Sequence, residues 1–288
     1  MLPFQHDEML RAALIEDAPW GDASALFIDE HATFDAKLVA RVAGRLAGIT
    51  LWARAFTLVD PTLSVDIALR DGHPFDAGAV LGQVSGSARS ILRAERVALN
   101  LVQRMSGIAT LTARYVSAVA GTDVRITDTR KTTPGLRAWE RAAVRAGGGY
   151  NHRYSLSDAV MIKDNHLAAM GVTTPKAVTE ALLRLRSTLP HTTAIEVEVD
   201  RLDQLKAVLA ADVDVIMLDN FSNDDLRTGV AMIGGRSLVE ASGGITLARV
   251  RSVAETGVDL ISVGALTQAA AALDLGLDVD EPGAAHAG

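Results

Sequence analysis

The chain has 288 residues, a formal net charge of −7 and no cysteine. The lack of cysteine excludes disulfides, thiolate catalysis and cysteine-bound metals, and the acidic balance argues against a nucleic-acid binder, which usually carries a basic face. No segment approaches the about 18 uninterrupted apolar residues that a membrane helix needs, and the first residues lack a signal-peptide pattern. We therefore expect a soluble, cytoplasmic protein without a membrane partner.

The first hundred residues predict a small, mostly antiparallel domain. Residues 1–17 have the pattern of a short helix. Three short alternating segments follow, separated by glycines, at residues 36–42, 64–69 and 79–84. Period-two alternation with glycine between the segments favours strands. Residues 90–120 then carry apolar residues at helical intervals, and we interpret Gly107 and Gly121 as a break and an end of that helix.

From residue 124 onward the chain alternates between aliphatic segments and helical patterns. Six aliphatic segments end on polar or small residues: 124–128, 159–163, 195–199, 215–219, 237–242 and 260–264. Strands that alternate with helices predict βα units and a parallel sheet. Hydrophobic residues make up 49% and aromatic residues only 4% of the chain, which suits buried parallel strands built from aliphatic side chains.

The strand ends favour a TIM-like α/β barrel for this part of the chain. In such a barrel, functional residues lie at the C-terminal ends of the strands, where these segments carry their polar residues. A doubly wound open sheet is the alternative, but no glycine fingerprint follows the first strand.

Positive charge is concentrated between residues 125 and 163, where eight lysines and arginines stand against three acidic residues. A positive segment in an acidic protein predicts a pocket for anions. Helical spacing indicates a solvated helix face for Arg137, Arg141 and Arg145. We assign a functional role to four other basic residues because they lie at or just after predicted strand ends: Arg130, Lys131, Arg153 and Lys163.

Glycine-rich turns indicate where phosphates bind. Gly147-Gly148-Gly149 lets the backbone approach a ligand closely beside the basic residues. Ser242-Gly243-Gly244 and Gly264-Ala265 follow two consecutive late strands, and in barrels the loops after the last strands often bind a phosphate.

Acidic residues alternate with valine in the segment Glu196-Val197-Glu198-Val199-Asp200. On a barrel strand this alternation predicts three carboxylates facing the lumen. Asp219 closes the next strand in the same manner. Glu198 and Asp219 are candidate ligands for Mg²⁺ or for sugar hydroxyls, and the alternative is that these acids neutralise lumen arginines. No nucleophile elbow, P-loop or zinc-helix motif is present, so electrostatic catalysis is expected.

Together these segments resemble the quinolinate phosphoribosyltransferase family. The matching segments run in order through Ala94-Glu95-Arg96, Ser106 to Thr110, Asp128 to Arg137, Gly147 to Arg153, Ile162 to His166, Glu196 to Glu198, Leu218 to Asn220, Glu240 to Gly244 and Ser262 to Thr267.

The resemblance implies an α/β fold with an N-terminal α/β sandwich domain plus a C-terminal TIM-like α/β barrel. The sandwich would comprise residues 1–105 joined by the C-terminal tail 271–288, and the barrel residues 106–270. The resemblance also implies a homodimer, or a multiple of dimers, in which one N-terminal domain closes the partner's barrel. The implied reaction converts quinolinate and phosphoribosyl pyrophosphate into nicotinate mononucleotide, CO₂ and pyrophosphate with Mg²⁺, a step of NAD biosynthesis.

The resemblance also assigns roles to site residues. The quinolinate and phosphate ligands correspond to Arg130, His152, Arg153 and Lys163. Arg96 corresponds to the arginine donated across the dimer interface, and Lys131 to a residue near the pyrophosphate. Glu198 and Asp219 correspond to the ribose and metal carboxylates. The 5′-phosphate loops correspond to Ser242, Gly243, Val263 and Gly264, and we add Thr129, Gly244 and Ala265 to the binding set. The expected catalytic residues are Lys131, Lys163, Glu198 and Asp219.

Other functions remain open from the sequence. A paralogue found with molybdate transport lacks the lysine and aspartate that this chain retains as Lys163 and Asp164. A nicotinate phosphoribosyltransferase needs fewer cations around its base and releases no CO₂. A lipoyl-like carrier requires an exposed lysine at a hairpin tip, and residues 68–84 contain none. A phosphosugar-binding regulator does not require Lys163, Glu198 and Asp219, all of which are present.

Overall fold

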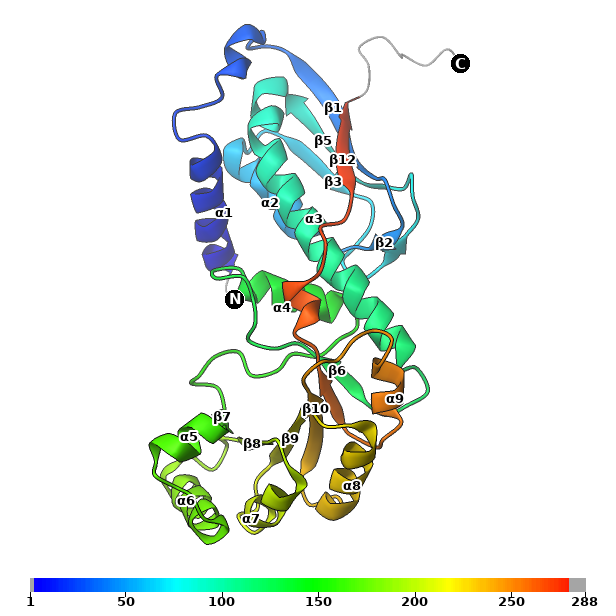
Figure 1. Cartoon of the computed structure of the whole chain (residues 1–288). Coiled ribbons are helices and arrows are strands. Elements are labelled where there is room, and N and C mark those ends of the chain that lie inside the picture. The colour runs from blue at the N-terminus through cyan, green and yellow to red at the C-terminus, as the bar shows by residue number, and fades with distance from the viewer. Residues whose placement is uncertain (1–2, 280–288) are drawn as a thin grey trace. The chain divides into compact units, whose positions relative to one another are not determined.

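The computed structural model describes residues 3–279, and these divide into two compact units (Figure 1). Of the described residues, unit 1 combines 3–113, 133–148 and 270–279, and unit 2 combines 114–132 and 149–269. Helix α3 (Ala88–Ala118) is continuous across the boundary expected at residue 105. None of the helices in the described part of the chain has the length and hydropathy that a membrane crossing requires.

Unit 1 is built on a four-stranded antiparallel sheet in the order β12-β1-β5-β3. These strands are β1 (Thr33–Ala40), β3 (Ser64–Ile67), β5 (Val80–Ser87) and β12 (Leu275–Val279), and a short pair joins β2 (Gly44–Arg45) to β4 (Pro74–Phe75). The helical segments are α1 (Pro3–Asp17), η1 (Ser24–Phe27), α2 (Ile49–Val59) and α4 (Arg137–Ala146). The mostly antiparallel sheet and the long helix that the sequence predicts are confirmed.

The core of unit 1 lies between the sheet and its helices. Trp52 and Phe56 on α2 are fully buried and pack edge to face, with ring centroids 5.1 Å apart. Gly82 on β5 gives Trp52 its space, because a Cβ there would lie 3.0 Å from the indole ring. The sequence interpretation of Gly107 as a helix break is wrong. Helix α3 runs through Gly107, which lacks a side chain because the carbonyl of Ala271 passes 1.9 Å from where its Cβ would be.

Unit 2 contains a six-stranded parallel sheet in the order β6-β11-β10-β9-β8-β7. The strands are β6 (Arg125–Thr127), β7 (Val160–Ile162), β8 (Ile195–Val199), β9 (Val215–Asp219), β10 (Leu238–Ser242) and β11 (Leu260–Ser262). The connecting helices are α5 (Asp164–Ala169), α6 (Pro175–Thr188), η2 (Leu202–Gln204), α7 (Leu205–Leu209), α8 (Asn223–Ile233), α9 (Val250–Ala254) and α10 (Ala265–Gln268). All six predicted strands are therefore present.

The strand order is that of a barrel with one interruption. From β7 to β11 each strand pairs with the next in the chain, and β11 pairs back to β6, the first strand of the unit. Within residues 3–279, β6 and β7 form no backbone ladder with each other. Tyr150, which lies between them in the chain, makes a single parallel bridge to Thr127. The predicted TIM-like α/β arrangement is confirmed, with six strands and a seam between β6 and β7.

Candidate active site

The inward side chains of the barrel surround a cavity of about 400 Å³. Every strand contributes to its wall: Arg125 and Thr127 come from β6, and the other five strands contribute Val160, Glu196, Val215, Glu240 and Leu260. Glu196 on β8 and Glu240 on β10 are 6% and 1% exposed. Buried carboxylates are costly unless they have partners, so their contacts identify what this interior is built to hold.

The carboxyl ends of β7 and β8 are joined by an ion pair between Lys163 and Glu198. Lys163 ends β7 and stands at the start of α5, where its backbone N–H donates to Nδ1 of His166 over 3.0 Å. Its side chain is 39% exposed and that of Glu198 is 18% exposed. A cation and a carboxylate are therefore placed together, and within reach of solvent, at two neighbouring strand ends.

Two guanidinium groups are gathered beside the barrel interior. Arg153 donates from Nη1 to the carbonyl of Ala159 over 2.8 Å. Burial lowers the pKa of Arg153, and the nearby positive charge of Arg130 lowers it further. The buried Nε of Arg130 has no hydrogen-bond partner in the described residues. Two arginines close enough to repel each other, one with an unused donor, form a site that an anion stabilises.

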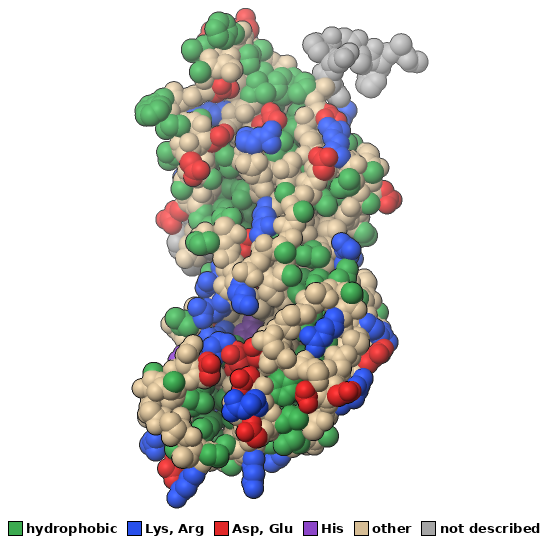
Figure 2. Space-filling model, viewed as in Figure 1, with side chains coloured by type: hydrophobic (Ala, Val, Ile, Leu, Met, Phe, Trp, Pro, Cys, Tyr) green, Lys and Arg blue, Asp and Glu red, His purple; other side chains and the backbone are tan. Residues whose placement is uncertain are grey.

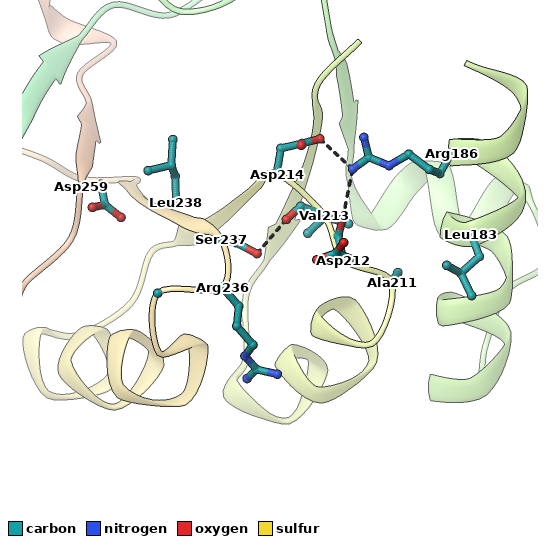
Figure 3. Close-up of a pocket in the computed structure, with 11 residues that line it drawn as sticks. Leu183, Arg186, Ala211, Asp212, Val213, Asp214, Arg236, Ser237, Leu238 and Asp259 are labelled. Carbon is teal, nitrogen blue, oxygen red and sulfur yellow. Dashed lines mark hydrogen bonds and ion pairs between the residues drawn. The ribbon is translucent and has the colours of Figure 1, made fainter. Parts of the chain in front are cut away.

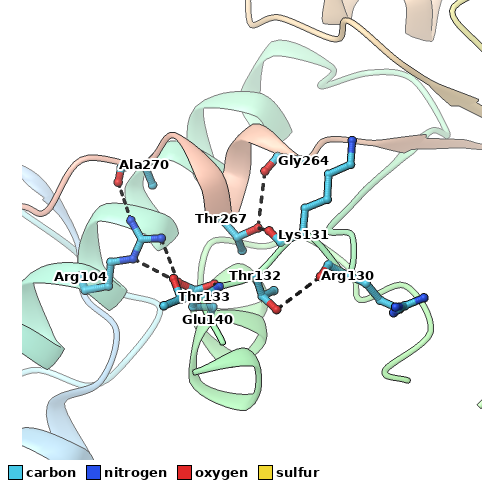
Figure 4. Close-up of polar contacts among 9 residues, drawn as sticks. All are labelled: Arg104, Arg130, Lys131, Thr132, Thr133, Glu140, Gly264, Thr267 and Ala270. Atoms are coloured by element: carbon cyan, nitrogen blue, oxygen red, sulfur yellow. Dashed lines mark hydrogen bonds and ion pairs between the residues drawn. The ribbon is translucent and has the colours of Figure 1, made fainter. Parts of the chain in front are cut away.

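Lys131 lies against the turn that follows β11 (Figure 4). Its carbonyl accepts a hydrogen bond from the Thr267 hydroxyl over 2.7 Å, and its backbone N–H donates to the Thr129 hydroxyl over 3.0 Å. A Cβ on Gly264 would lie 3.2 Å from Cδ of Lys131. The structure thus brings together the lysine after β6 and the small turn after β11, as a phosphate-binding loop requires.

The ends of β9 and β10 form a second tight turn. Asn220 has a positive φ of 60°, and its amide donates to the Asp219 carboxylate over 2.7 Å. Its backbone N–H donates to the carbonyl of Ser242 over 2.9 Å. Gly243, with φ of 84°, is required because a Cβ there would lie 2.2 Å from Oδ1 of Asn220. Asp219 is therefore oriented by the same contact that shapes the loop after β10.

His152 connects the seam of the barrel to the two buried glutamates. Its Nε2 lies 3.2 Å from Oε2 of Glu196 and 3.4 Å from Oε2 of Glu240. Its Nδ1 accepts a hydrogen bond from the backbone N–H of Arg153 over 2.8 Å. The fully buried Asp128 accepts from the backbone N–H of His152 over 2.8 Å and from the side-chain amide of Asn151 over 2.6 Å.

These contacts shift the pKa values of His152 and Glu196. Burial lowers the pKa of His152, but its hydrogen bonds and charge interactions with Glu196 and Glu240 outweigh this and raise it to about 10. Burial also raises the pKa of Glu196. With its pKa raised in this way, His152 keeps an additional proton at neutral pH.

The residues present fit a divalent cation at the strand ends. Glu198 and Asp219 end adjacent paired strands and offer the carboxylate oxygens that Mg²⁺ prefers. A different group, His152 with Glu196 and Glu240, is the one trio in residues 3–279 whose candidate ligand atoms all lie within 4.8 Å of one another. Its tautomer opposes metal binding, because the Arg153 N–H faces Nδ1 and leaves the proton on Nε2, the nitrogen that faces the carboxylates.

A larger cavity of about 800 Å³ lies at the opposite, N-terminal ends of β9 and β10 (Figure 3). Its polar groups are bound to one another or to backbone. Arg186 pairs with Asp214 over 2.7 Å, and Asp214 also accepts the backbone N–H of Ile195 at the start of β8. Asp259 accepts the N–H of Val239 on β10 in the same way. These aspartates anchor strand starts, whereas barrel active sites lie at the C-terminal ends.

Two predicted site residues differ in their surroundings from the rest. Arg96 lies on α3 in unit 1 with an exposed side chain. The expectation that three carboxylates of β8 face the lumen is wrong for Asp200, which is 61% exposed and pairs with Arg201 at the surface because the strand has already ended at Val199. The remaining predicted polar residues lie in unit 2: His152 and Arg153 are in the segment before β7, and the others are at or after the carboxyl ends of its strands.

Sequence reasoning gave no role to Asp128, Asn151 and Glu240. For Asp128 the missed signal is an acid directly after a short aliphatic strand. For Glu240 it is an acid at an inward position of an otherwise apolar segment, and such a residue needs a buried partner.

The parallel barrel with its basic strand ends is typical of an α/β enzyme that binds anionic substrates. Family models described as "Quinolinate phosphoribosyl transferase, N-terminal domain" and "C-terminal domain" match residues 22–106 and 108–278. The chain belongs to the quinolinate phosphoribosyltransferase family.

Individual relatives agree over nearly the whole chain. A probable nicotinate-nucleotide pyrophosphorylase [carboxylating] of Synechocystis is 42% identical over 276 residues, covering 95% of this chain and 92% of the relative. The Bacillus subtilis protein of the same description is 41% identical and covers 96% and 93%. Among solved structures, NadC from Streptococcus pyogenes is 42% identical with a TM-score of 0.90, covering 97% of this chain and 98% of that one.

Proposed function

We propose that this protein transfers the phosphoribosyl group of phosphoribosyl pyrophosphate to quinolinate, with loss of CO₂ and pyrophosphate, to give nicotinate mononucleotide. The observation that carries this proposal is the gathering of Arg130 and Arg153 beside the barrel interior. Quinolinate has two adjacent carboxylates, and planar guanidinium groups suit such a pair. Its relatives carry the names of enzymes for this reaction.

The bonds that form and break in this reaction suggest roles for the charged residues at the strand ends. The pyridine nitrogen forms a bond to C1 of the ribose as the bond from C1 to pyrophosphate breaks. C1 becomes electron-poor on the way, and a carboxylate such as Glu198 stabilises that charge. The carboxylate at C2 then leaves as CO₂, and C2 takes a proton. The electrons left at C2 are stabilised by the new positive ring nitrogen and by cations such as Lys163.

The phosphates are expected at the small turns. Lys131 beside Gly264 supports a pyrophosphate or 5′-phosphate position, as does the turn after β10. In this proposal the 5′-phosphate contacts Ser242, Gly243, Gly244, Val263, Gly264 and Ala265, while Thr129 supports Lys131. Mg²⁺ is proposed on Glu198 and Asp219, where it neutralises charge on the departing pyrophosphate.

A homodimer is the proposed assembly. Arg96 has an exposed side chain on α3, so it is available to a partner's barrel. Unit 1 also exposes large apolar side chains around η1 (Figure 2), with Trp20 97% and Phe27 93% exposed. Exposed aromatic side chains of this size are typical of an interface. The cysteine-free sequence fits a reducing compartment, which supports the proposed cytoplasmic location.

The test is the reaction itself. Purified protein is incubated with phosphoribosyl pyrophosphate, Mg²⁺ and either quinolinate or nicotinate, and both nicotinate mononucleotide and released CO₂ are measured. Product and CO₂ from quinolinate alone are expected. Product from nicotinate without CO₂ would instead establish the monoacid transferase, and binding without product from either would favour a regulator or an inactive paralogue.

A further inference from the structure

The seam of the barrel is closed by one backbone bridge, in which Tyr150 bonds to Ile126 and Asp128, and by side-chain contacts. Asp128 follows β6 and binds the next segment through the His152 backbone N–H and the Asn151 amide. On the lumen side, His152 reaches across the barrel to β8 and β10 through Glu196 and Glu240. Segment 150–153 is therefore fixed from both sides, although it belongs to no strand.

Both ring nitrogens of His152 are engaged within the barrel. Nε2 faces the two carboxylates, Nδ1 accepts from the Arg153 N–H, and the side chain is only 13% exposed. The ring thus touches the backbone of the residue whose guanidinium lies beside Arg130. Contacts that hold the His152 ring therefore also hold the backbone of Arg153. The guanidinium at the other end of the Arg153 side chain is held by the carbonyl of Ala159.

Two buried carboxylates, Glu196 and Glu240, are unexpected close to a site that binds anions. Each has its Oε2 directed at His152, and Oε1 of each is buried without a hydrogen-bond partner. Negative charge below an anion pocket weakens anion binding, so these carboxylates do not serve the substrate directly. Burying these carboxylates near an anion costs free energy. That cost is offset only if a fixed His152 ring, and through it a fixed Arg153, improves substrate binding by more than the carboxylates weaken it.

We propose that Glu196 and Glu240 are positioning residues that act through His152 to hold Arg153 in place for the pyridine dicarboxylate. The inference rests on the proposed function, because it names quinolinate as the ligand of Arg153. Neither glutamate touches the substrate. The pair ties a segment that belongs to no strand to β8 and β10, so that the arginine does not depend on a free loop.

The test compares two substitutions at each glutamate. Glu240→Met and Glu196→Met keep the volume but remove the acceptor for Nε2, whereas Glu240→Gln and Glu196→Gln retain an oxygen that accepts. We expect the Met variants to raise the quinolinate Kd and KM about tenfold or more, which corresponds to a loss of about 1.4 kcal/mol. The Gln variants should stay within about threefold, and the KM for phosphoribosyl pyrophosphate should change less than twofold in all four.

A double-mutant cycle with Arg153→Ala separates positioning from general damage. If the glutamates act through Arg153, Glu240→Met has no further effect on quinolinate affinity once Arg153 is alanine. If Glu240→Met does not fold, the same cycle is run with Glu196→Met, which removes the other carboxylate that contacts Nε2 of His152. Asp214→Asn is the matched control, because its carboxylate anchors Ile195 on β8 at the far end of the barrel. It should lower stability without changing quinolinate affinity.

Wild-type protein is titrated with quinolinate by calorimetry in the same series. Additive effects in the cycle, or equal losses of affinity for both substrates, would overturn the positioning role while leaving the proposed function intact. Failure of the wild type to bind quinolinate at all would instead overturn the proposed function.

Discussion

Lys163 and Glu198 form an ion pair across the carboxyl ends of β7 and β8. Because the lysine is 39% exposed, we expect this pair to contribute only about 0–1 kcal/mol to stability. Lys163→Ala should therefore keep its unfolding midpoint and lose activity at least about 100-fold, as expected when a cation at a developing charge is removed. The same outcome is expected for Arg153→Ala. Steady-state rates and thermal unfolding measure both effects.

Lys176→Ala on α6 is the matched control for Lys163→Ala. Its ion pair with Glu180 is exposed and remote from the strand ends, so the variant should behave as wild type. Unfolding of Lys163→Ala at the assay temperature, or full activity in it, would contradict the role given to Lys163.

Gly243→Ala should both strain the turn after β10 and move Asp219. The new Cβ would lie 2.2 Å from Oδ1 of Asn220, whose amide holds the Asp219 carboxylate. Gly235→Ala is the control, because Gly235 has a similar positive φ of 74° with open space where its Cβ would be. Urea unfolding should show a loss of about 1 kcal/mol for the control and clearly more for Gly243→Ala. Only Gly243→Ala should raise the KM for phosphoribosyl pyrophosphate, and equal effects would disprove this account.

Glu140 on α4 is a buried carboxylate with a full set of donors (Figure 4). It is 1% exposed and accepts from Arg104 Nη2 over 2.8 Å and from the Thr133 hydroxyl over 2.8 Å. Glu140→Ala leaves Arg104 without this charge, and we expect a loss of about 3 kcal/mol in urea unfolding. Glu180→Ala, at an exposed pair, should cost less than about 1 kcal/mol. A Glu140→Ala variant as stable as wild type would show that the network is not structural.

Stability should fall with rising pH because of the cluster around His152. Its pKa is raised from 6.5 to about 10, so the folded protein binds a proton that the unfolded chain releases. That contribution is fully present below pH 6.5 and is lost as the pH rises towards 10. The unfolding midpoint of wild type should therefore decline more steeply over this window than that of His152→Gln. Parallel declines in the two proteins would refute the raised pKa.

Chelation should abolish activity without unfolding the protein. Lys163 already pairs with Glu198, and Asn220 already binds Asp219, so the proposed Mg²⁺ carboxylates are not left to repel each other when the ion is removed. We expect EDTA to stop turnover and added Mg²⁺ to restore it, with an unchanged unfolding midpoint. Asp219→Asn should require more Mg²⁺ for half-maximal rate. Full turnover in excess EDTA would exclude the metal role.

The strands and the polar strand ends could be predicted from the sequence because both depend on local patterns. Each of the six aliphatic segments is a strand in the structure, and Lys163 and Glu198 meet because parallel strands bring their carboxyl ends to one edge. The role of Gly107 could not be predicted correctly, because in a sequence a glycine that makes room for a neighbouring segment cannot be distinguished from a glycine that ends a helix. Only the position of Ala271 distinguishes the two cases.

The buried cluster could not be predicted because its contacts join segments far apart in the chain. His152, Glu196 and Glu240 come from a loop and two strands, and no spacing rule relates them. Asp200 follows the same alternation as Glu196 and Glu198, but the strand ends one residue earlier, and a sequence pattern locates such an end only approximately.

The interrupted ladder between β6 and β7 means that strand pairing alone does not close this barrel. Elsewhere around the sheet, widening the barrel means breaking rows of backbone hydrogen bonds. At the seam, the links are the Tyr150 bridge and the side-chain contacts of segment 150–153. Arg153 belongs to this segment, so its position in the proposed site depends on these individual links and not on the register of a strand.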